Sequence, residues 1–155
     1  MKRAALAVLM LLSTVDEAWA DGRFWLVTPG ESARLGQPPP QGRTPMAAEE
    51  GDGPVIRVKT PSLDAAVRSP VSILVQFEPG RSGLAPDMAS LTVTLRGFIT
   101  IDITDRLRDY VVGQTLAVEG AELPTGSHRI RLAIADRGGA ISARDMILTV
   151  AEPPR

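Results

Sequence analysis

Apolar and polar residues alternate in short runs from Pro54 to Val150. In the clearest run, Ile130, Leu132 and Ile134 are separated by arginine and alanine. A period of two is typical of a β-strand with one buried face. About seven such runs occur between turn residues, and no stretch has the length of a crossover helix. We therefore expect one antiparallel β-sandwich, with a barrel as the lesser alternative.

The alternation predicts strands at residues 55–59, 71–78, 91–96, 99–104, 116–118, 129–134 and 146–150. One helical signal interrupts them at residues 104–110. There, Thr104 is expected to cap a single turn whose Leu107 and Val111 face inward. Residues 152–155 are expected to be a short tail.

The segment Ala121–Asp136 contains a Leu-Pro-Thr-Gly turn, then His128 and an alternating strand that ends at Asp136. It resembles the penultimate hairpin of bacterial immunoglobulin-like and fibronectin type III-like domains, and the resemblance covers residues 54–151. It implies an immunoglobulin-like β-sandwich, a fold used outside the cytoplasm for spacing, adhesion or partner binding. By analogy with the tyrosine corner of such domains, His128 is expected to fasten the turn to nearby backbone.

The N-terminus has the features of a secretory signal peptide. Lys2 and Arg3 precede the apolar stretch 4–12, which is too short to span a bilayer. Ala18-Trp19-Ala20 has the form of a signal peptidase site. We expect residues 1–20 to be removed and the mature protein to be periplasmic or secreted.

Charge and cysteine content restrict the partners. The chain has no cysteine, so we expect neither disulfides nor a lipid anchor on a cysteine. Lys and Arg total 17 and Asp and Glu total 18, a balance that predicts no nucleic-acid partner. No segment after the signal peptide has the apolar length of a transmembrane helix.

Residues 21–53 are rich in Pro and Gly and are expected to be mainly a flexible linker. Within them, Phe24, Trp25, Leu26 and Val27 form a short apolar motif that could adopt a strand. One interpretation is that the motif packs on an edge strand of its own domain. A second is that it binds a partner protein by strand addition or in a groove, and a third is simple disorder.

No catalytic constellation is recognisable. The single histidine, His128, lies at a predicted turn, and a catalytic triad would need a histidine beside a nucleophile. One histidine without cysteine also makes a zinc site improbable. Carboxylates that could gather at one end of the sandwich and bind calcium are Asp102, Asp105, Asp109 and Asp136. The favoured alternative is structural, with Asp102 and Asp105 capping the turn near Thr104 and Asp136 bonding its own loop.

Four arginines on solvent-facing strand positions form a possible basic strip, namely Arg57, Arg96, Arg129 and Arg131. The favoured alternative is a solvated face on which these arginines pair with cross-strand acids such as Asp102 or Glu119.

These observations predict a non-enzymatic exported module of the bacterial cell envelope without a cofactor. It would bind a protein partner through the Phe24–Val27 motif or a sheet edge, or be a passive structural component. The alternative is a calcium-binding or small-ligand-binding protein that uses the carboxylates at one end of the sandwich.

Overall fold

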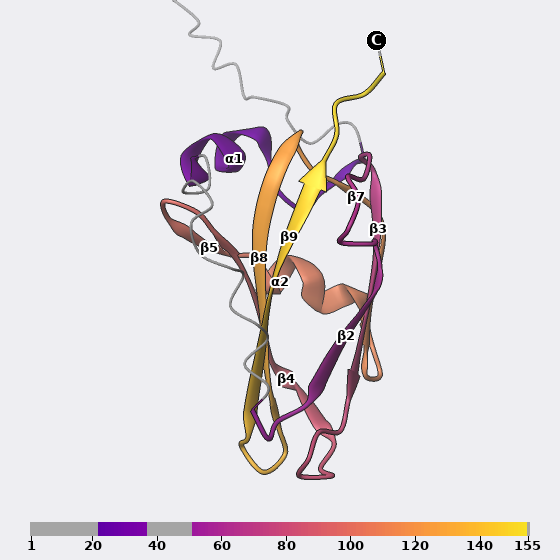
Figure 1. Ribbon diagram of the computed structural model, residues 1–155, viewed down its shortest axis with the longest axis vertical. Coiled ribbons are helices and arrows are strands. Elements are labelled where there is room, and N and C mark those ends of the chain that lie inside the picture. Colours follow the sequence, from indigo (N-terminus) through magenta and orange to yellow (C-terminus); the bar gives the residue numbers. More distant parts are fainter. Residues whose placement is uncertain (1–21, 37–50, 155) are drawn as a thin grey trace, which may run out of the picture.

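The computed structural model describes residues 22–36 and 51–154. The described chain is mostly β and forms two sheets, in an arrangement compatible with a β-sandwich (Figure 1). The predicted signal peptide and residues 37–50 of the predicted linker lie outside the described residues.

Sheet A has the strand order β1-β7-β3-β2, and β6 pairs with β7. Its strands are β1 (Phe24–Trp25), β2 (Val55–Thr60), β3 (Val71–Glu78), β6 (Val111–Val112) and β7 (Thr115–Glu122). Sheet B has the order β5-β4-β8-β9. Its strands are β4 (Pro86–Arg96), β5 (Thr100–Asp102), β8 (Gly126–Asp136) and β9 (Ile141–Val150). A strand therefore occupies each of the seven predicted positions.

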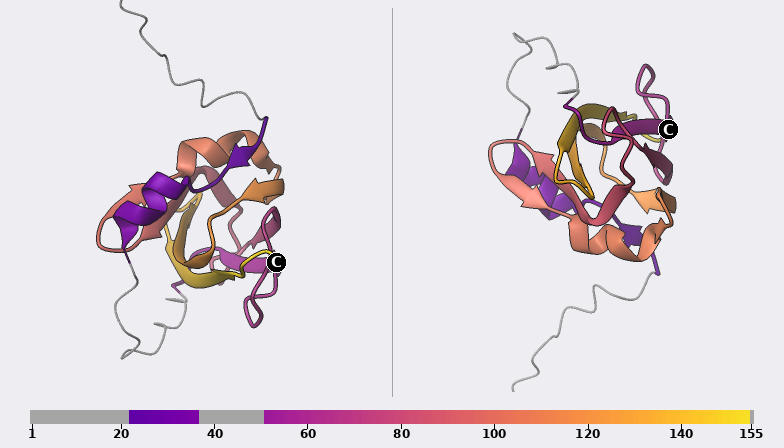
Figure 2. Two further views of the ribbon diagram at one scale, coloured as in Figure 1. Left: turned by 90° about the horizontal axis from the view of Figure 1, so that it is seen from above. Right: turned by 90° about the horizontal axis from the view of Figure 1, so that it is seen from below.

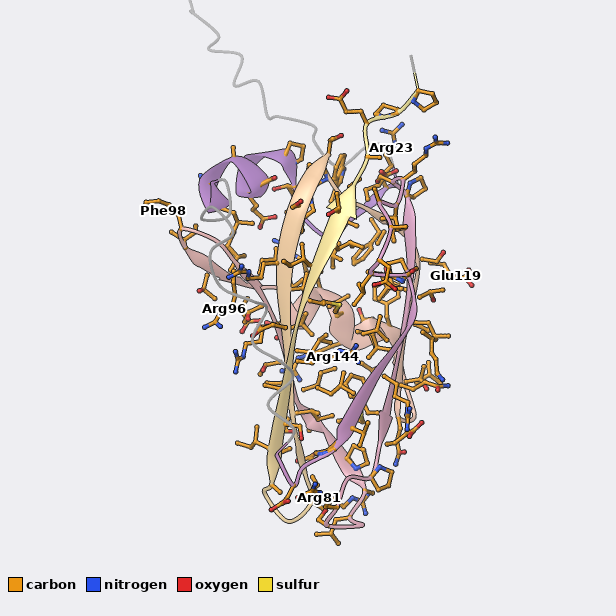
Figure 3. All side chains as sticks on the ribbon, viewed as in Figure 1. Arg23, Arg81, Arg96, Phe98, Glu119 and Arg144 are labelled. Carbon is orange, nitrogen blue, oxygen red and sulfur yellow. The ribbon has the colours of Figure 1, made fainter. Side chains whose placement is uncertain are left out.

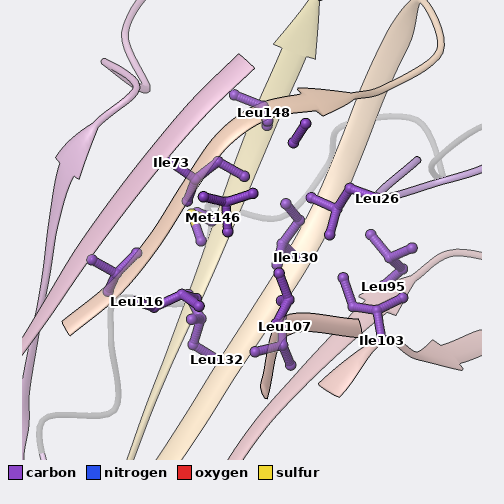
Figure 4. Packing of buried hydrophobic residues seen from close by; sticks show 14 of the residues in the cluster. Leu26, Ile73, Leu95, Ile103, Leu107, Leu116, Ile130, Leu132, Met146 and Leu148 are labelled. Atoms are coloured by element: carbon purple, nitrogen blue, oxygen red, sulfur yellow. The ribbon is translucent and has the colours of Figure 1, made fainter. Parts of the chain in front are cut away.

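The apolar residues of the alternating runs form the core of the molecule. In β3 the buried side chains are those of Val71, Ile73, Val75 and Phe77. Their counterparts from sheet B belong to the same hydrophobic cluster, part of which is seen in Figure 4. Removing these side chains from water is the main favourable contribution to folding.

The turn between β8 and β9 is fixed by Asp136, which is buried. Its Oδ1 accepts hydrogen bonds from the backbone N–H groups of Gly138 (2.8 Å) and Ala140 (2.9 Å), and the Ser82 hydroxyl donates to Oδ2. The bond from Ser82, together with the backbone bonds, lowers the pKa of Asp136. Asp136 thus has the loop-stabilising contacts that the structural interpretation describes.

The predicted helical turn is present as α2 (Thr104–Leu107) followed by the 3₁₀ helix η1 (Arg108–Tyr110). The capping role predicted for Thr104 was wrong. Thr104 is buried, and its hydroxyl accepts a hydrogen bond from Val93 N (2.9 Å) on β4. The carboxylate of Asp102 instead accepts the N–H of Thr104 (2.8 Å). The Thr104 hydroxyl, and then this backbone bond, lower the pKa of Asp102.

Residues 22–36, which the sequence analysis assigned mainly to a linker, form β1 and the helix α1 (Pro29–Leu35). The helix is short, and its proline is at the first turn, where a missing N–H costs nothing. Thr28 and Glu31 form a capping box: Glu31 N donates to Thr28 Oγ1 (3.2 Å), and Thr28 N donates to Glu31 Oε2 (2.9 Å). Figure 2 shows α1 beside the β4–β5 hairpin at one end of the molecule.

Candidate functional site

The apolar motif Phe24–Val27 lies on sheet A of its own chain. Phe24 and Trp25 pair in parallel with Ala121 and Glu122 of β7, and Leu26 N donates to Glu122 O (3.0 Å). Leu26 and Val27 are 1% and 0% exposed and belong to the core. Leu26 is seen among the core side chains in Figure 4. Phe24 and Trp25 are half-buried. In this arrangement the motif covers the edge of β7 and offers a partner only its two aromatic residues.

Polar contacts hold the motif and α1 in place. The guanidinium of Arg106 on α2 binds both carboxylate oxygens of Glu31. Its Nη1 donates to Oε2 (2.9 Å), and its Nη2 donates to Oε1. The same Nη1 donates to Leu26 O (3.0 Å). The hydrogen bonds from Arg106 lower the Glu31 pKa from 4.5 to about 2. One partly buried ion pair therefore connects the N-terminal segment to the domain.

The end of α1 fastens the hairpin between β4 and β5. Phe98 N donates to Leu35 O (2.7 Å), and a Cβ at Gly97 would lie only 2.4 Å from that oxygen. Only glycine therefore permits this approach. The Phe98 side chain itself is 91% exposed at the tip of the hairpin (Figure 3). Neither α1 nor its contact with this hairpin was predicted from the sequence.

His128 is 4% exposed, and its Nε2 lies 2.7 Å from the carbonyl oxygen of Pro124. This is a contact with backbone four residues upstream, of the kind that the analogy with the tyrosine corner describes. The ring is thereby engaged in a turn contact inside the fold.

Replacing His128 by Phe keeps an aromatic ring but removes this hydrogen bond. We expect His128→Phe to lower the free energy of unfolding by about 1 kcal/mol, because the Pro124 carbonyl loses its partner. Urea denaturation followed by circular dichroism measures the change, with Ser127→Ala on the exposed neighbour as the control. Equal stability of the His128→Phe variant and the parent protein would exclude a structural role for the bond.

The four aspartates do not form the predicted carboxylate cluster. Asp102 pairs with Thr94 and Asp136 with Pro86, which places them eight residues apart along β4, roughly 25 Å in an extended strand. Within residues 22–36 and 51–154, no group of three or more His, Cys, Asp or Glu side chains could hold a metal ion. A calcium ion shared by Asp102 and Asp136 is excluded by this separation.

The possible basic strip is divided between the two sheets. Arg96 and Arg129 are cross-strand neighbours on sheet B, and Arg131 lies two residues further along β8. Arg131 pairs with Asp145 (3.0 Å). On sheet A, Arg57 pairs with Glu78 (2.7 Å). The predicted alternative of cross-strand pairing therefore fits these two arginines, but their acids are not those expected from sequence.

A pocket of about 360 Å³ opens where the edge strands of the two sheets meet, β2 from sheet A and β9 from sheet B. Three glycines and three arginines contribute to its walls, namely Gly51, Gly53, Gly80, Arg57, Arg81 and Arg144. A Cβ at Gly80 would lie 1.8 Å from Gly53 O, so this wall depends on bare backbone. No Asp or Glu is among the lining residues. This pocket was not predictable from local sequence, because β2 and β9 lie at opposite ends of the domain sequence.

Arg144 spans the two edge strands. Its Nη1 donates to the carbonyl oxygen of Ile56 on β2 (2.7 Å), and the side chain is half-buried. Figure 3 shows Arg144 in the middle of the molecule, between the two sheets, and Arg81 at the end that carries the β8–β9 turn. The residues that line the pocket therefore contribute three positive charges and no negative charge.

The outer edge of β9 is covered at both ends and is unpaired between them. Val67 pairs with Val150 at one end of β9, and its N–H donates to Thr149 O (2.8 Å). At the other end, Gly51 and Gly53 lie against the backbone of residues 140–142, since a Cβ on Gly51 would lie 2.4 Å from Ile141 O and one on Gly53 2.5 Å from Ala140 O. In the described part of the chain, no residue pairs with this edge between Ala143 and Leu148. Backbone N–H and C=O groups on an open edge can pair with another strand.

Comparison with protein-family profiles, curated proteins and solved structures finds no match to this chain. Among the described residues, no helix combines the length and apolar character needed to cross a membrane.

Proposed function

We propose that this chain is an exported, non-enzymatic interaction module of the bacterial cell envelope with an immunoglobulin-like fold. It binds a protein partner by adding a strand of that partner to the outer edge of β9. Support for export comes from the signal-peptide features of residues 1–20.

The strand order supports the immunoglobulin-like assignment. The neighbours β2-β3-β7 correspond in chain order to strands A, B and E of such domains, and β5-β4-β8-β9 correspond to C′, C, F and G. β1 occupies the place beside strand E that strand D takes in immunoglobulin domains, but it is parallel to its neighbour.

One observation carries the proposal: the two sides of the molecule differ in how their strand edges are covered. The side of β7 that faces away from β3 pairs with β1 and β6. On the other side, β9 has no strand partner from Ala143 to Leu148 within the described structure. Strand addition uses such an edge for its backbone bonds and nearby pockets for specificity.

Site-specific photo-cross-linking tests the proposal. A benzophenone amino acid replaces Ile141 on β9, which is 66% exposed, or Val112 beside β7, which is 72% exposed. We expect a discrete cross-linked protein in the envelope of the producing bacterium from position 141 and not from position 112. Excess unmodified protein should abolish the product. Equal cross-linking from both positions, or none from either, would contradict binding at the β9 edge.

A further inference from the structure

We propose that the pocket between β2 and β9 binds an acidic side chain of the partner strand. The partner is then a peptide segment that places glutamate or aspartate on one face of the added strand. This inference rests on the proposed function, because it names the chemistry of the partner that adds to β9.

Arg144 is the central group. In the described part of the chain it makes no ion pair, and its hydrogen bond is to the neutral carbonyl of Ile56. A guanidinium has five N–H donors in a planar fork, which matches the two oxygens of a carboxylate. A half-buried guanidinium without a charged partner gains most from one, because such pairs are stronger away from bulk water.

Arg57 and Arg81 add to the positive electrostatic potential that Arg144 creates in the pocket. Arg57 shares its charge with Glu78, and both side chains are about half exposed. Arg81 is exposed and has no hydrogen bond or ion pair within the described structure. With three guanidinium groups and no acid in its walls, the pocket favours an anion and repels basic side chains.

Strand geometry sets the pattern of the partner. Side chains of an added strand alternate between the two faces of sheet B. Ser142 and Arg144 line the pocket from the inner face of β9, with Ala143 between them. Side chains of the partner on that same inner face recur at every second position. The sequence expected is therefore one with an acid at alternate positions.

Two synthetic peptides test this inference with the exported protein purified from a bacterial host. One blocked, fluorescently labelled peptide alternates threonine with glutamate, and the other alternates threonine with glutamine. We expect the glutamate peptide to bind at least about tenfold tighter in fluorescence anisotropy, and this preference to shrink as salt is raised. Arg144→Gln and Arg81→Gln should each reduce the preference, and Arg96→Gln, on the outer face of β4, should leave it intact.

The two peptides separate the inference from the proposed function. Equal binding of both peptides would overturn the acidic specificity and leave strand addition to β9 standing. Absence of binding by either peptide would overturn both. An equal loss of preference in the Arg96→Gln variant would show general charge attraction and overturn the pocket assignment. Because Arg144→Gln also removes the bond to Ile56, the exposed Arg81→Gln variant provides the test that does not depend on folding.

Discussion

Leu26→Ala is expected to lower the free energy of unfolding by about 2–5 kcal/mol, although Leu26 lies outside the predicted domain. The residue is 1% exposed and packs in the cluster shared by both sheets (Figure 4). Shortening it removes buried apolar surface and leaves a cavity that the surrounding sheets cannot fill completely. Urea denaturation followed by circular dichroism measures the change.

Phe98→Ala provides the matched control, because it removes a larger apolar side chain that is 91% exposed. That variant should unfold at the same urea concentration as the parent protein. Equal stability of the Leu26→Ala variant and the parent would show that the N-terminal segment is not part of the folded core. A confirmed loss would also mean that deleting residues 21–53 cannot test partner binding, since the deletion would damage the fold.

Glu31→Gln is expected to lower the free energy of unfolding by about 1–2 kcal/mol near pH 7. The drop of the Glu31 pKa from 4.5 to about 2 corresponds to roughly 3 kcal/mol if solvent screening is ignored. The side chains of Glu31 and Arg106 are 19% and 35% exposed, so solvent reduces this value. Urea denaturation of parent and variant at pH 7 measures the difference.

The pH dependence gives the same prediction a second readout. Glu31 has a lower pKa in the folded state, so its contribution is complete above about pH 4.5 and is lost as the pH falls towards 2. The stability difference between parent and Glu31→Gln should therefore shrink over that interval. Asp102 and Asp136 also have lowered pKa values, so the variant should still lose stability in acid.

Asp105→Asn is the control for this ion pair. Asp105 pairs with Arg108 at 2.8 Å, but its side chain is 94% exposed. An exposed pair of this kind contributes little, so the variant should match the parent at every pH. A constant difference between parent and Glu31→Gln from pH 7 to pH 2 would contradict the role given to the Glu31 carboxylate.

The strand positions were predictable because they depend on local pattern. Alternating residues such as Val71, Ile73, Val75 and Phe77 specify which face of a strand is buried, whatever its neighbours are. The turn at Asp136 was predictable for a similar reason, since its carboxylate bonds to backbone two and four residues away. The capping prediction for Thr104 was wrong because its hydroxyl bonds to the backbone of Val93 on β4, which local sequence does not indicate.

The candidate sites required the tertiary structure. The Phe24–Val27 motif was visible in sequence as strand-competent, but only pairing with Ala121 and Glu122 shows which edge it covers. The pocket joins Arg57, Arg81 and Arg144, which have no regular spacing along the chain.

The sequence by itself determined that residues 54–150 form short alternating strands separated by turns, because side-chain periodicity and turn chemistry act over a few residues. Only the tertiary structure decided that the end of β7 at Ala121 and Glu122 is covered by the chain's own N-terminal segment and that β9 is unpaired from Ala143 to Leu148 beside an arginine-lined pocket. The physical reason is that strand neighbours and pocket walls arise from contacts between distant segments, and alternation within one strand carries no information about its partner.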